Sequence, residues 1–212
     1  RRALTAPVLG EGIAGGAGWL AQGLVLGIAV NLSTRSLLDP ELVEDVLGLL
    51  NHHGVPPHML TLEITEGSVM SDLAGTTTVL DRLHDAGVRL SVDDFGTGYS
   101  SLSYLSRLPV DEVKIDKLFV LGMRDDEQDA AIVRSVIDLG TSLGLEVVAE
   151  GVEDEATWTR LVSLGCDQAQ GWFLSHAMPL KDIPAFVENH LPYSGLRALP
   201  TRRSLDPRVR TG

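Results

Sequence analysis

The sequence predicts an α/β fold in which parallel strands alternate with helices. Short apolar runs rich in β-branched residues recur along the chain, and helical patterns lie between them. Glycines follow several of these helical patterns, as is common just after the last turn of a helix. The apolar runs are nearly continuous, which is typical of strands buried on both faces of a parallel sheet.

Length and composition agree with this prediction. The 212 residues can bury the core of one α/β domain, and 44% hydrophobic with 22% charged residues argues against a disordered chain. The single cysteine, Cys166, excludes an internal disulfide and indicates a reducing compartment, so we expect a cytoplasmic protein. A net charge of -12 argues against nucleic acid polymers and anionic membranes as partners. It still allows a phosphorylated substrate that is held through a metal ion.

The first elements lie in an uncharged segment, residues 12 to 34, which is long enough to raise the question of a membrane span. Several glycines and the polar residues Gln22 and Asn31 interrupt this segment. We therefore prefer a helix around Trp19–Gln22, a turn at Gly23 and a strand over Val25–Leu32.

Five further strands and six helices follow. The strands are expected at Met59–Ile64, Val88–Val92, Glu112–Ile115, Leu145–Ala149 and Ala169–Leu174. The helices are expected at Pro40–His52, Leu73–Ala86, Ser100–Leu108, Glu127–Leu143, Glu155–Leu164 and Leu180–Leu191. Asp39 and Asp72 suit helix starts, and Gly54, Gly87, Gly144 and Gly165 suit helix stops. We expect one domain over residues 1–191 and a disordered, basic tail with Pro and Arg over residues 192–212.

Polar residues recur where the predicted strands end. They are Asn31, Glu63, Asp93, Asp94 and Glu150; Lys114 lies within another strand, and Gln170 lies directly before the GWFL of the last. The carboxyl ends of parallel strands open on one face of a sheet or barrel, so these side chains should converge. A helix cap or a solvated loop acid would explain any one of them, but their recurrence favours a shared site.

Asp93 and Asp94 are the most informative pair. Neighbouring residues of a strand point to opposite faces, so both can serve one site only where the strand turns, and the glycines of the following FGTG permit a turn. Adjacent carboxylates repel each other unless cations neutralise them. Oxygen donors suit Mg²⁺ or Mn²⁺, and two such ions support in-line displacement at phosphorus.

Lys114 could hold an attacking water or stabilise phosphate charge; a salt bridge to Asp111 or Asp116 is the alternative.

Six stretches carry a more specific signal. They are NLS at 31–33, LEITEG at 62–67, DDFGTGYSSL at 93–102, VKIDK at 113–117, VVAEGVE at 147–153 and QGWFLS at 170–175. In order and spacing they resemble the EAL domain family of cyclic-di-GMP phosphodiesterases, and the resemblance covers roughly residues 1–191.

The resemblance implies a modified TIM-type (β/α)8 barrel that cuts cyclic-di-GMP to linear pGpG with two Mg²⁺ or Mn²⁺ ions, in bacterial second-messenger signalling. The metal centre it implies consists of Asn31, Glu63, Asp93, Asp94 and Glu150, with Asp93 bridging. It further implies that Lys114 contacts the nucleophilic water and that Gln170 is another polar residue of the active site. Glu66 would hold the loop Phe95–Leu102, which in the family couples metal binding to dimerisation.

The sequence departs from the family in one respect: the glutamate of the family signature, which is a metal ligand in the family, is absent. The 30 residues before Asn31 match the helix that follows the signature strand, so we expect about six of the eight strands here and the others upstream in a parent protein. An incomplete barrel exposes strand edges, and a lost ligand weakens metal binding. Two alternatives to an enzyme therefore stay open: a catalytically inactive module that binds cyclic-di-GMP or regulates, and a remnant without function.

The resemblance also suggests partners. We expect a homodimer formed through the barrel face and the Phe95–Leu102 loop, and an upstream sensor or GGDEF-type domain in the parent protein. A membrane anchor upstream of the chain is left open.

Overall fold

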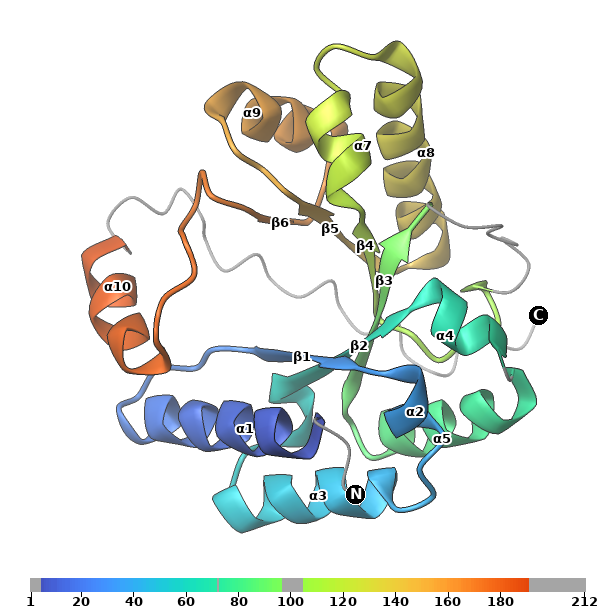
Figure 1. Cartoon of the computed structure of the whole chain (residues 1–212). Coiled ribbons are helices and arrows are strands. Elements are labelled where there is room, and N and C mark those ends of the chain that lie inside the picture. Colours follow the sequence, from blue (N-terminus) through green and yellow to red (C-terminus); the bar gives the residue numbers. More distant parts are fainter. Residues whose placement is uncertain (1–4, 72, 97–104, 191–212) are drawn as a thin grey trace, which may run out of the picture. The chain divides into compact units, whose positions relative to one another are not determined.

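The computed structural model describes residues 5–71, 73–96 and 105–190 (Figure 1). The chain divides into two compact units, Arg1–Ala177 and Met178–Gly212. The first unit contains a parallel sheet in which the strands follow one another in sequence order, from β1 to β6. This sheet of six strands, covered by helices, confirms the α/β prediction and its number of strands.

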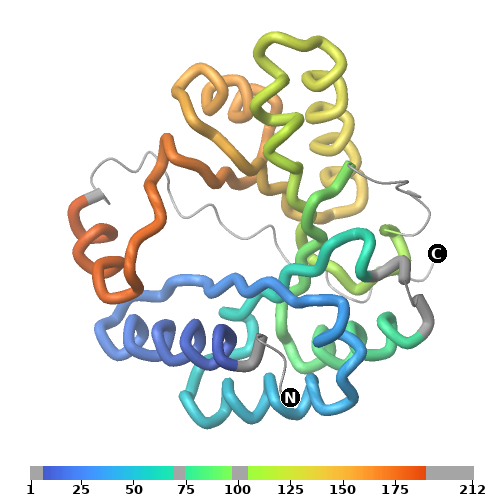
Figure 2. The backbone as a smooth tube through the Cα atoms, viewed as in Figure 1, coloured from blue at the N-terminus to red at the C-terminus, as the bar shows by residue number. Residues whose placement is uncertain are grey.

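The six strands begin and end within three residues of the predicted positions, except at the last strand. They are β1 (Ile28–Leu32), β2 (Leu60–Thr65), β3 (Arg89–Phe95), β4 (Glu112–Ile115), β5 (Glu146–Glu150) and β6 (Gln168–Gln170). The tube in Figure 2 follows the curl of this sheet, with the helices of the first unit outside it.

The helices of the first unit alternate with the strands along the chain. They are α1 (Thr5–Ala21), α2 (Thr34–Leu37), α3 (Leu42–His53), the short η1 (Pro57–Met59), α4 (Glu66–Ser71), α5 (Leu73–Asp85), α7 (Lys117–Gly122), α8 (Glu127–Leu143) and α9 (Glu155–Leu164). The second unit contains η2 (Leu180–Asp182) and α10 (Ile183–His190), where one helix was predicted. The expected stops at Gly54, Gly87, Gly144 and Gly165 all adopt positive φ, as a left-handed helix end requires.

The prediction for the first helix was too short. Helix α1 runs from Thr5 to Ala21 and includes glycines that were expected to interrupt it. A Cβ atom at Gly16 would lie 2.2 Å from Cδ1 of Ile28, and one at Gly12 would lie 3.3 Å from Cγ2 of the same residue. These glycines therefore let the helix pack closely against β1, which outweighs their low helix propensity. No helix among the described residues is long and apolar enough to cross a membrane.

The prediction for the last strand was wrong beyond Gln170. The chain turns after β6, where the amide of Leu174 donates to the carbonyl oxygen of Gly171 at 3.0 Å. Gly171 also packs against the backbone of Val152, at a distance that leaves no room for a Cβ atom. Trp172 is 65% exposed and Phe173 is 41% exposed, so the apolar run WFL marks a turn rather than a buried strand.

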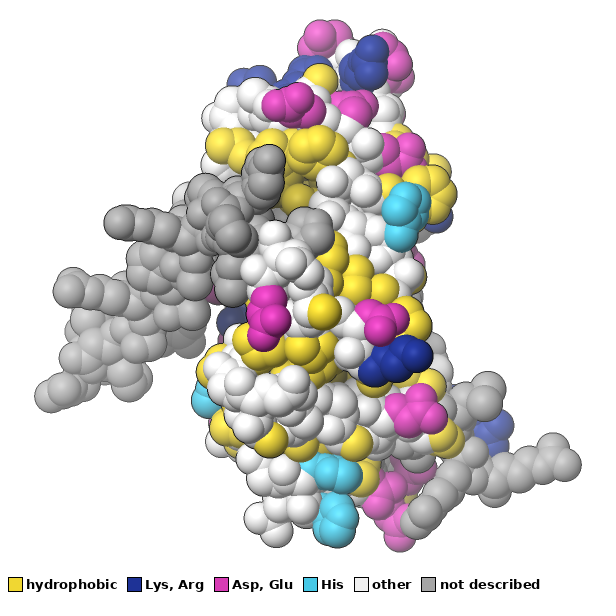
Figure 3. Space-filling view, turned by 90° about the vertical axis from the view of Figure 1, so that its left-hand side faces the viewer, with side chains coloured by type: hydrophobic (Ala, Val, Ile, Leu, Met, Phe, Trp, Pro, Cys, Tyr) yellow, Lys and Arg dark blue, Asp and Glu magenta, His cyan; other side chains and the backbone are white. Residues whose placement is uncertain are grey.

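Hydrophobic and acidic side chains reach the surface on the face drawn in Figure 3.

Some predictions fall outside the described residues. They are the start of a helix at Asp72, most of the helix Ser100–Leu108 and the tail 192–212. Helix α7 was not predicted at all, although Asp116 caps it by accepting a hydrogen bond from the amide of Leu118 at 2.7 Å.

The two faces of the sheet differ in polarity. Side chains on the face toward the helices are apolar and buried, for example Leu62, Val113 and Val147, each with no exposed surface. The opposite, inward face carries alternating polar side chains, among them Glu63 on β2 and Lys114 on β4. The interior of a TIM-type barrel is usually filled with branched apolar residues. The polar inward face therefore marks where chemistry is to be sought.

Candidate active site

The carboxyl ends of the strands meet at one edge of the sheet, as predicted. Strand register places Asn31 beside Glu63, Thr65 beside Asp93 and, further along the sheet, Glu150 beside Gln170. Residues that are far apart in the sequence therefore come from neighbouring strand ends.

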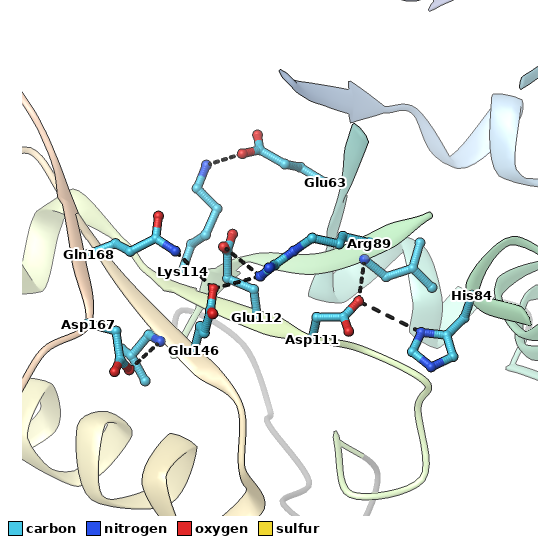
Figure 4. A network of polar contacts seen from close by, with 11 residues as sticks. Glu63, His84, Arg89, Asp111, Glu112, Lys114, Glu146, Asp167 and Gln168 are labelled. Atoms are coloured by element: carbon cyan, nitrogen blue, oxygen red, sulfur yellow. Dashed lines mark hydrogen bonds and ion pairs between the residues drawn. The ribbon is translucent and has the colours of Figure 1, made fainter. Parts of the chain in front are cut away.

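Lys114 lies at the centre of this edge, with a side chain that is only 5% exposed. Its Nζ atom lies 2.5 Å from Oε1 of Glu150, 3.0 Å from Oε1 of Glu63 and 3.3 Å from Oδ1 of Asp93. Figure 4 shows the lysine reaching from β4 toward Glu63 on β2. Burial opposes the charged amine, but the contacts with Glu150 and Glu63 outweigh it and raise the pKa of Lys114 above its ordinary value. The lysine is therefore a fixed positive charge at neutral pH.

Asp93 and Asp94 occupy the point where β3 turns. Asp94 has a φ of 57°, the only positive φ among the described residues that are not glycine. Its amide donates to Oδ1 of Asp93 at 3.1 Å, and the register between β3 and β4 shifts between Val92 and Phe95. This local conformation is uncommon for a residue with a Cβ atom, and it turns both carboxylates toward the same site. Burial, a hydrogen bond with Asp116 and the charge of Asp93 raise the pKa of the Asp94 carboxyl.

Three carboxylates at this edge of the sheet form an oxygen cluster that is suited to a cation. Asp93, Asp94 and Glu150 each offer one carboxylate oxygen, and these atoms lie within 4.8 Å of one another. Hard divalent cations such as Mg²⁺ and Mn²⁺ prefer such ligands, and a cation would offset the repulsion between the adjacent acids. The donor set therefore fits a divalent metal ion.

The other predicted metal ligands lie beside this cluster. Glu63 is 7% exposed and is linked to Asp93 and Glu150 through the ammonium of Lys114. Asn31 is exposed on β1, in register with Glu63.

The remaining predicted site residues lie at the periphery. Gln170 is exposed at the end of β6, beside Glu150. Glu66 is the first residue of α4 and is partly buried. The loop it was expected to hold is described only at Phe95 and Gly96, so that expectation lies outside the described residues.

Lys114 does form salt bridges, but with Glu63, Asp93 and Glu150 and not with the predicted partners Asp111 and Asp116. Asp111 instead accepts a hydrogen bond from the amide of Leu90 at 2.9 Å, and Asp116 caps α7.

Two features of the site were missed in the sequence. Asp116 contacts Asp94 from the strand end of β4, and an aspartate directly before a helix could have indicated its capping role. A chain of hydroxyl groups also joins the segments after β1 and β2. The oxygen of Ser68 lies 2.7 Å from that of Thr34 and 2.7 Å from that of Thr65. No sequence signal indicates this chain, because Thr34 and Ser68 belong to different βα units.

Comparisons with known proteins agree with this geometry. The family model described as "EAL domain" matches residues 8–177. The bifunctional diguanylate cyclase/cyclic di-GMP phosphodiesterase MucR of Pseudomonas aeruginosa is 46% identical over 160 residues, which are 76% of this chain and 23% of that protein. The cyclic di-GMP phosphodiesterase NbdA of the same organism is 39% identical over 181 residues, 85% of this chain and 23% of the relative. The chain thus spans about a quarter of the length of the curated relatives it matches.

Solved structures with the same arrangement include the PaMucR phosphodiesterase in a c-di-GMP complex, with a TM-score of 0.81 and 43% identity over 84% of this chain and 72% of that chain. The EAL domain of Mycobacterium smegmatis DcpA gives a TM-score of 0.82 at 40% identity, over 88% of this chain and 84% of that chain. A calcium/cy-diGMP complex of Klebsiella pneumoniae BlrP1 gives 0.74 at 33% identity, over 81% of this chain and 43% of that chain.

Proposed function

Because the chain belongs to the EAL domain family, we propose that it serves the hydrolysis of cyclic-di-GMP to linear pGpG by a mechanism with two divalent metal ions. The observation that carries this proposal is the position of Lys114, which contacts carboxylates from three other strands beside an oxygen cluster suited to a cation. Relatives named as cyclic di-GMP phosphodiesterases support the choice of substrate.

The metal ligands would come from the strand ends. We propose Asp93, Asp94 and Glu150 as the central ligands, with Asp93 bridging, and Glu63 and Asn31 as the ligands from the neighbouring strands. Bound Mg²⁺ or Mn²⁺ would offset the negative charge of a phosphodiester and lower the pKa of a coordinated water. BlrP1, a similar structure, is a calcium/cy-diGMP complex, which supports the involvement of a divalent ion.

Lys114 and two further residues complete the proposed site. The ammonium of Lys114 forms ion pairs with Glu63, Asp93 and Glu150, which fix its position. We propose that it contacts an attacking water and stabilises charge on the phosphate. We propose Gln170 as a polar contact at the open end of β6. We propose that Glu66, at the start of α4, positions the loop after β3.

The test is direct. The chain is incubated with cyclic-di-GMP and either Mg²⁺ or Mn²⁺, and linear pGpG is quantified by chromatography. Glu63→Gln should abolish product formation because it removes a charged ligand and keeps the side-chain shape. Arg82→Met is the control, because Arg82 pairs with Glu44 on the exposed side of the helices. Absence of linear product with both metals would contradict hydrolysis by this chain.

Binding without hydrolysis is the second candidate. It is favoured by the ion pairs of Lys114 with three carboxylates, which are equally suited to a structural role. Calorimetry with cyclic-di-GMP in Ca²⁺ and in Mg²⁺ separates the two candidates. Saturable binding without product supports a binding module, whereas no binding in either ion contradicts both.

The partners follow from the same proposal. We propose a homodimer that involves the loop Phe95–Leu102, and a larger parent protein that carries a sensor or GGDEF-type domain. The name of MucR, a bifunctional diguanylate cyclase and phosphodiesterase, supports such a combination. We also propose a cytoplasmic location, where a second messenger would be met.

A further inference from the structure

A second charged cluster lies on the inward face of the sheet, and the proposed reaction does not use it. Nη2 of Arg89 donates to Oε2 of Glu146 at 2.6 Å and lies 3.8 Å from Oε2 of Glu112 (Figure 4). Nε2 of Gln168 donates to the same oxygen of Glu146 at 2.9 Å. These four residues, here called the lower cluster, join β3, β4, β5 and β6 near the amino ends of the strands.

The lower cluster shares its strands with the candidate active site. Residues two or four positions apart on a strand face the same side of a sheet. Each of three strands carries one residue of each cluster on the inward face: Arg89 and Asp93 on β3, Glu112 and Lys114 on β4, and Glu146 and Glu150 on β5. Anything that moves one of these strands relative to its neighbours therefore disturbs both clusters.

Arg89 is placed to link strands that do not pair with each other. Its guanidinium reaches from β3 past Glu112 on β4 to Glu146 on β5, whereas β3 has hydrogen bonds only with β2 and β4 in the sheet. Lys114 makes the corresponding link at the carboxyl ends, from β4 to β2, β3 and β5. Side chains thus link β3, β4 and β5 both near the amino ends and near the carboxyl ends of these strands.

Stability alone is a weak explanation for the lower cluster. The side chains of Glu112, Glu146 and Arg89 are only 10%, 22% and 27% exposed, so each has lost most of its hydration. Burial raises the pKa of the Glu112 carboxyl, which shows that its charge is not fully compensated. Replacing a buried ion pair by apolar residues of similar volume is often neutral or stabilising in other proteins. A requirement for fixed strand positions is a better explanation.

We propose that Arg89 is a positioning residue, which fixes β3, β4 and β5 relative to one another and so sets the spacing of the polar side chains in the candidate active site. A guanidinium suits this task because it is planar, always charged and able to bond several acceptors from one fixed position. The catalytic consequence rests on the proposed function, but the geometric one does not.

The first test measures geometry without activity. Arg89→Met removes the charge and keeps most of the side-chain length, and Arg82→Met makes the same change at an exposed ion pair. The readout is the ammonium NMR signal of Lys114, assigned by its loss in Lys114→Arg. We expect the signal to shift or broaden in Arg89→Met, to stay in place in Arg82→Met, and to recover in part in Arg89→Lys. An unmoved Lys114 signal in Arg89→Met overturns the proposal.

A second variant guards against loss of folding. Glu146→Gln keeps the shape of the side chain and an oxygen for Gln168, but it removes the charge that holds Arg89. If Arg89→Met does not fold, this variant decides the question. A smaller shift of the Lys114 signal supports the proposal, and an unmoved signal overturns it.

The second test is kinetic. If the protein hydrolyses cyclic-di-GMP, Arg89→Met should lower kcat about tenfold with KM changed less than about twofold, because misplaced catalytic groups affect the reaction more than binding. Arg89→Lys should recover part of the rate, which a loss of folding would not allow. An unchanged kcat in an active enzyme overturns the catalytic part. If no variant has activity and the Lys114 signal still moves, the proposed function fails and the positioning role stands.

Discussion

The ammonium of Lys114 on β4 lies 2.5 Å from a carboxylate oxygen of Glu150 on the neighbouring strand β5. The same ammonium contacts Glu63 and Asp93, so one buried cation joins the ends of four successive strands. The charge balance of the candidate active site therefore depends on a single side chain.

Replacement of this cation should be costly for both stability and activity. Lys114→Met leaves three carboxylates without a counter-charge, and breaking a buried ion pair in this way costs about 3–5 kcal/mol in free energy of unfolding. We expect this loss in urea denaturation without metal, together with a loss of hydrolysis of about 100-fold or more. Mn²⁺ should narrow the stability difference, since a divalent cation can replace the missing charge. A loss below about 1 kcal/mol, the value typical of exposed ion pairs, would show that the contacts are weak.

Divalent cations should stabilise the native protein through the oxygen cluster. A ligand that binds only the folded state raises the melting temperature with its concentration, so Mn²⁺ should raise Tm and a chelator should reverse the effect. Asp93→Asn should lose most of this response and all hydrolysis, because it removes one charge from the oxygen cluster. Asp45→Asn, an exposed acid in the first turn of α3, is the control. An equal Mn²⁺ response in Asp93→Asn would place the metal elsewhere.

Glycines in α1 provide a matched test of packing against β1. A Cβ atom at Gly16 would clash with Ile28, so Gly16→Ala should destabilise the protein by about 1–3 kcal/mol, as overpacking does elsewhere. At Gly18 a Cβ atom meets nothing within 4 Å, so Gly18→Ala should stabilise the protein by up to about 1 kcal/mol through helix propensity. Urea unfolding of the two variants and the wild type would measure both changes. Equal effects at the two positions would contradict the close packing of α1 on β1.

The lower cluster should produce a pH dependence of stability through Glu112. Burial raises the pKa of this carboxyl in the folded protein, so the folded state holds the proton more tightly than the unfolded state. The contribution of Glu112 to the free energy of unfolding therefore falls as the pH rises from the ordinary carboxyl pKa, about 4.3, through the raised value. Glu112→Gln removes this contribution, so the Tm of the variant should rise relative to the Tm of the wild type as the pH rises.

The control for this titration has the opposite sign. The hydrogen bond from Arg82 lowers the pKa of Glu44, so Glu44 contributes stability above its ordinary pKa and loses it as the pH falls through the lowered value. Glu44→Gln should therefore lose stability relative to the wild type as the pH rises. A Tm difference for Glu112→Gln that stays constant between pH 4 and pH 8 would show that Glu112 does not titrate abnormally.

Much of the fold was predictable because its signals are local. The helices Glu127–Leu143 and Glu155–Leu164 were predicted with the bounds that the structure has, since an Asp cap and a Gly stop frame each of them. The first five strands were also predicted, because their apolar runs are bounded by turns. The turn after β6 was misread because Gly171 is required by a contact with Val152, about twenty residues earlier, which no local pattern reveals.

The sequence by itself determined which polar residues stand at the strand ends, because strand periodicity and the common direction of parallel strands are written in local patterns. The tertiary structure decided how those residues combine. It placed Lys114 against three carboxylates rather than against Asp111 or Asp116, and it built the lower cluster around Arg89. Both depend on the register and curl of the sheet, which bring side chains of non-adjacent strands within ion-pair distance. Contacts of that kind join residues far apart in the chain, so only the folded sheet specifies them.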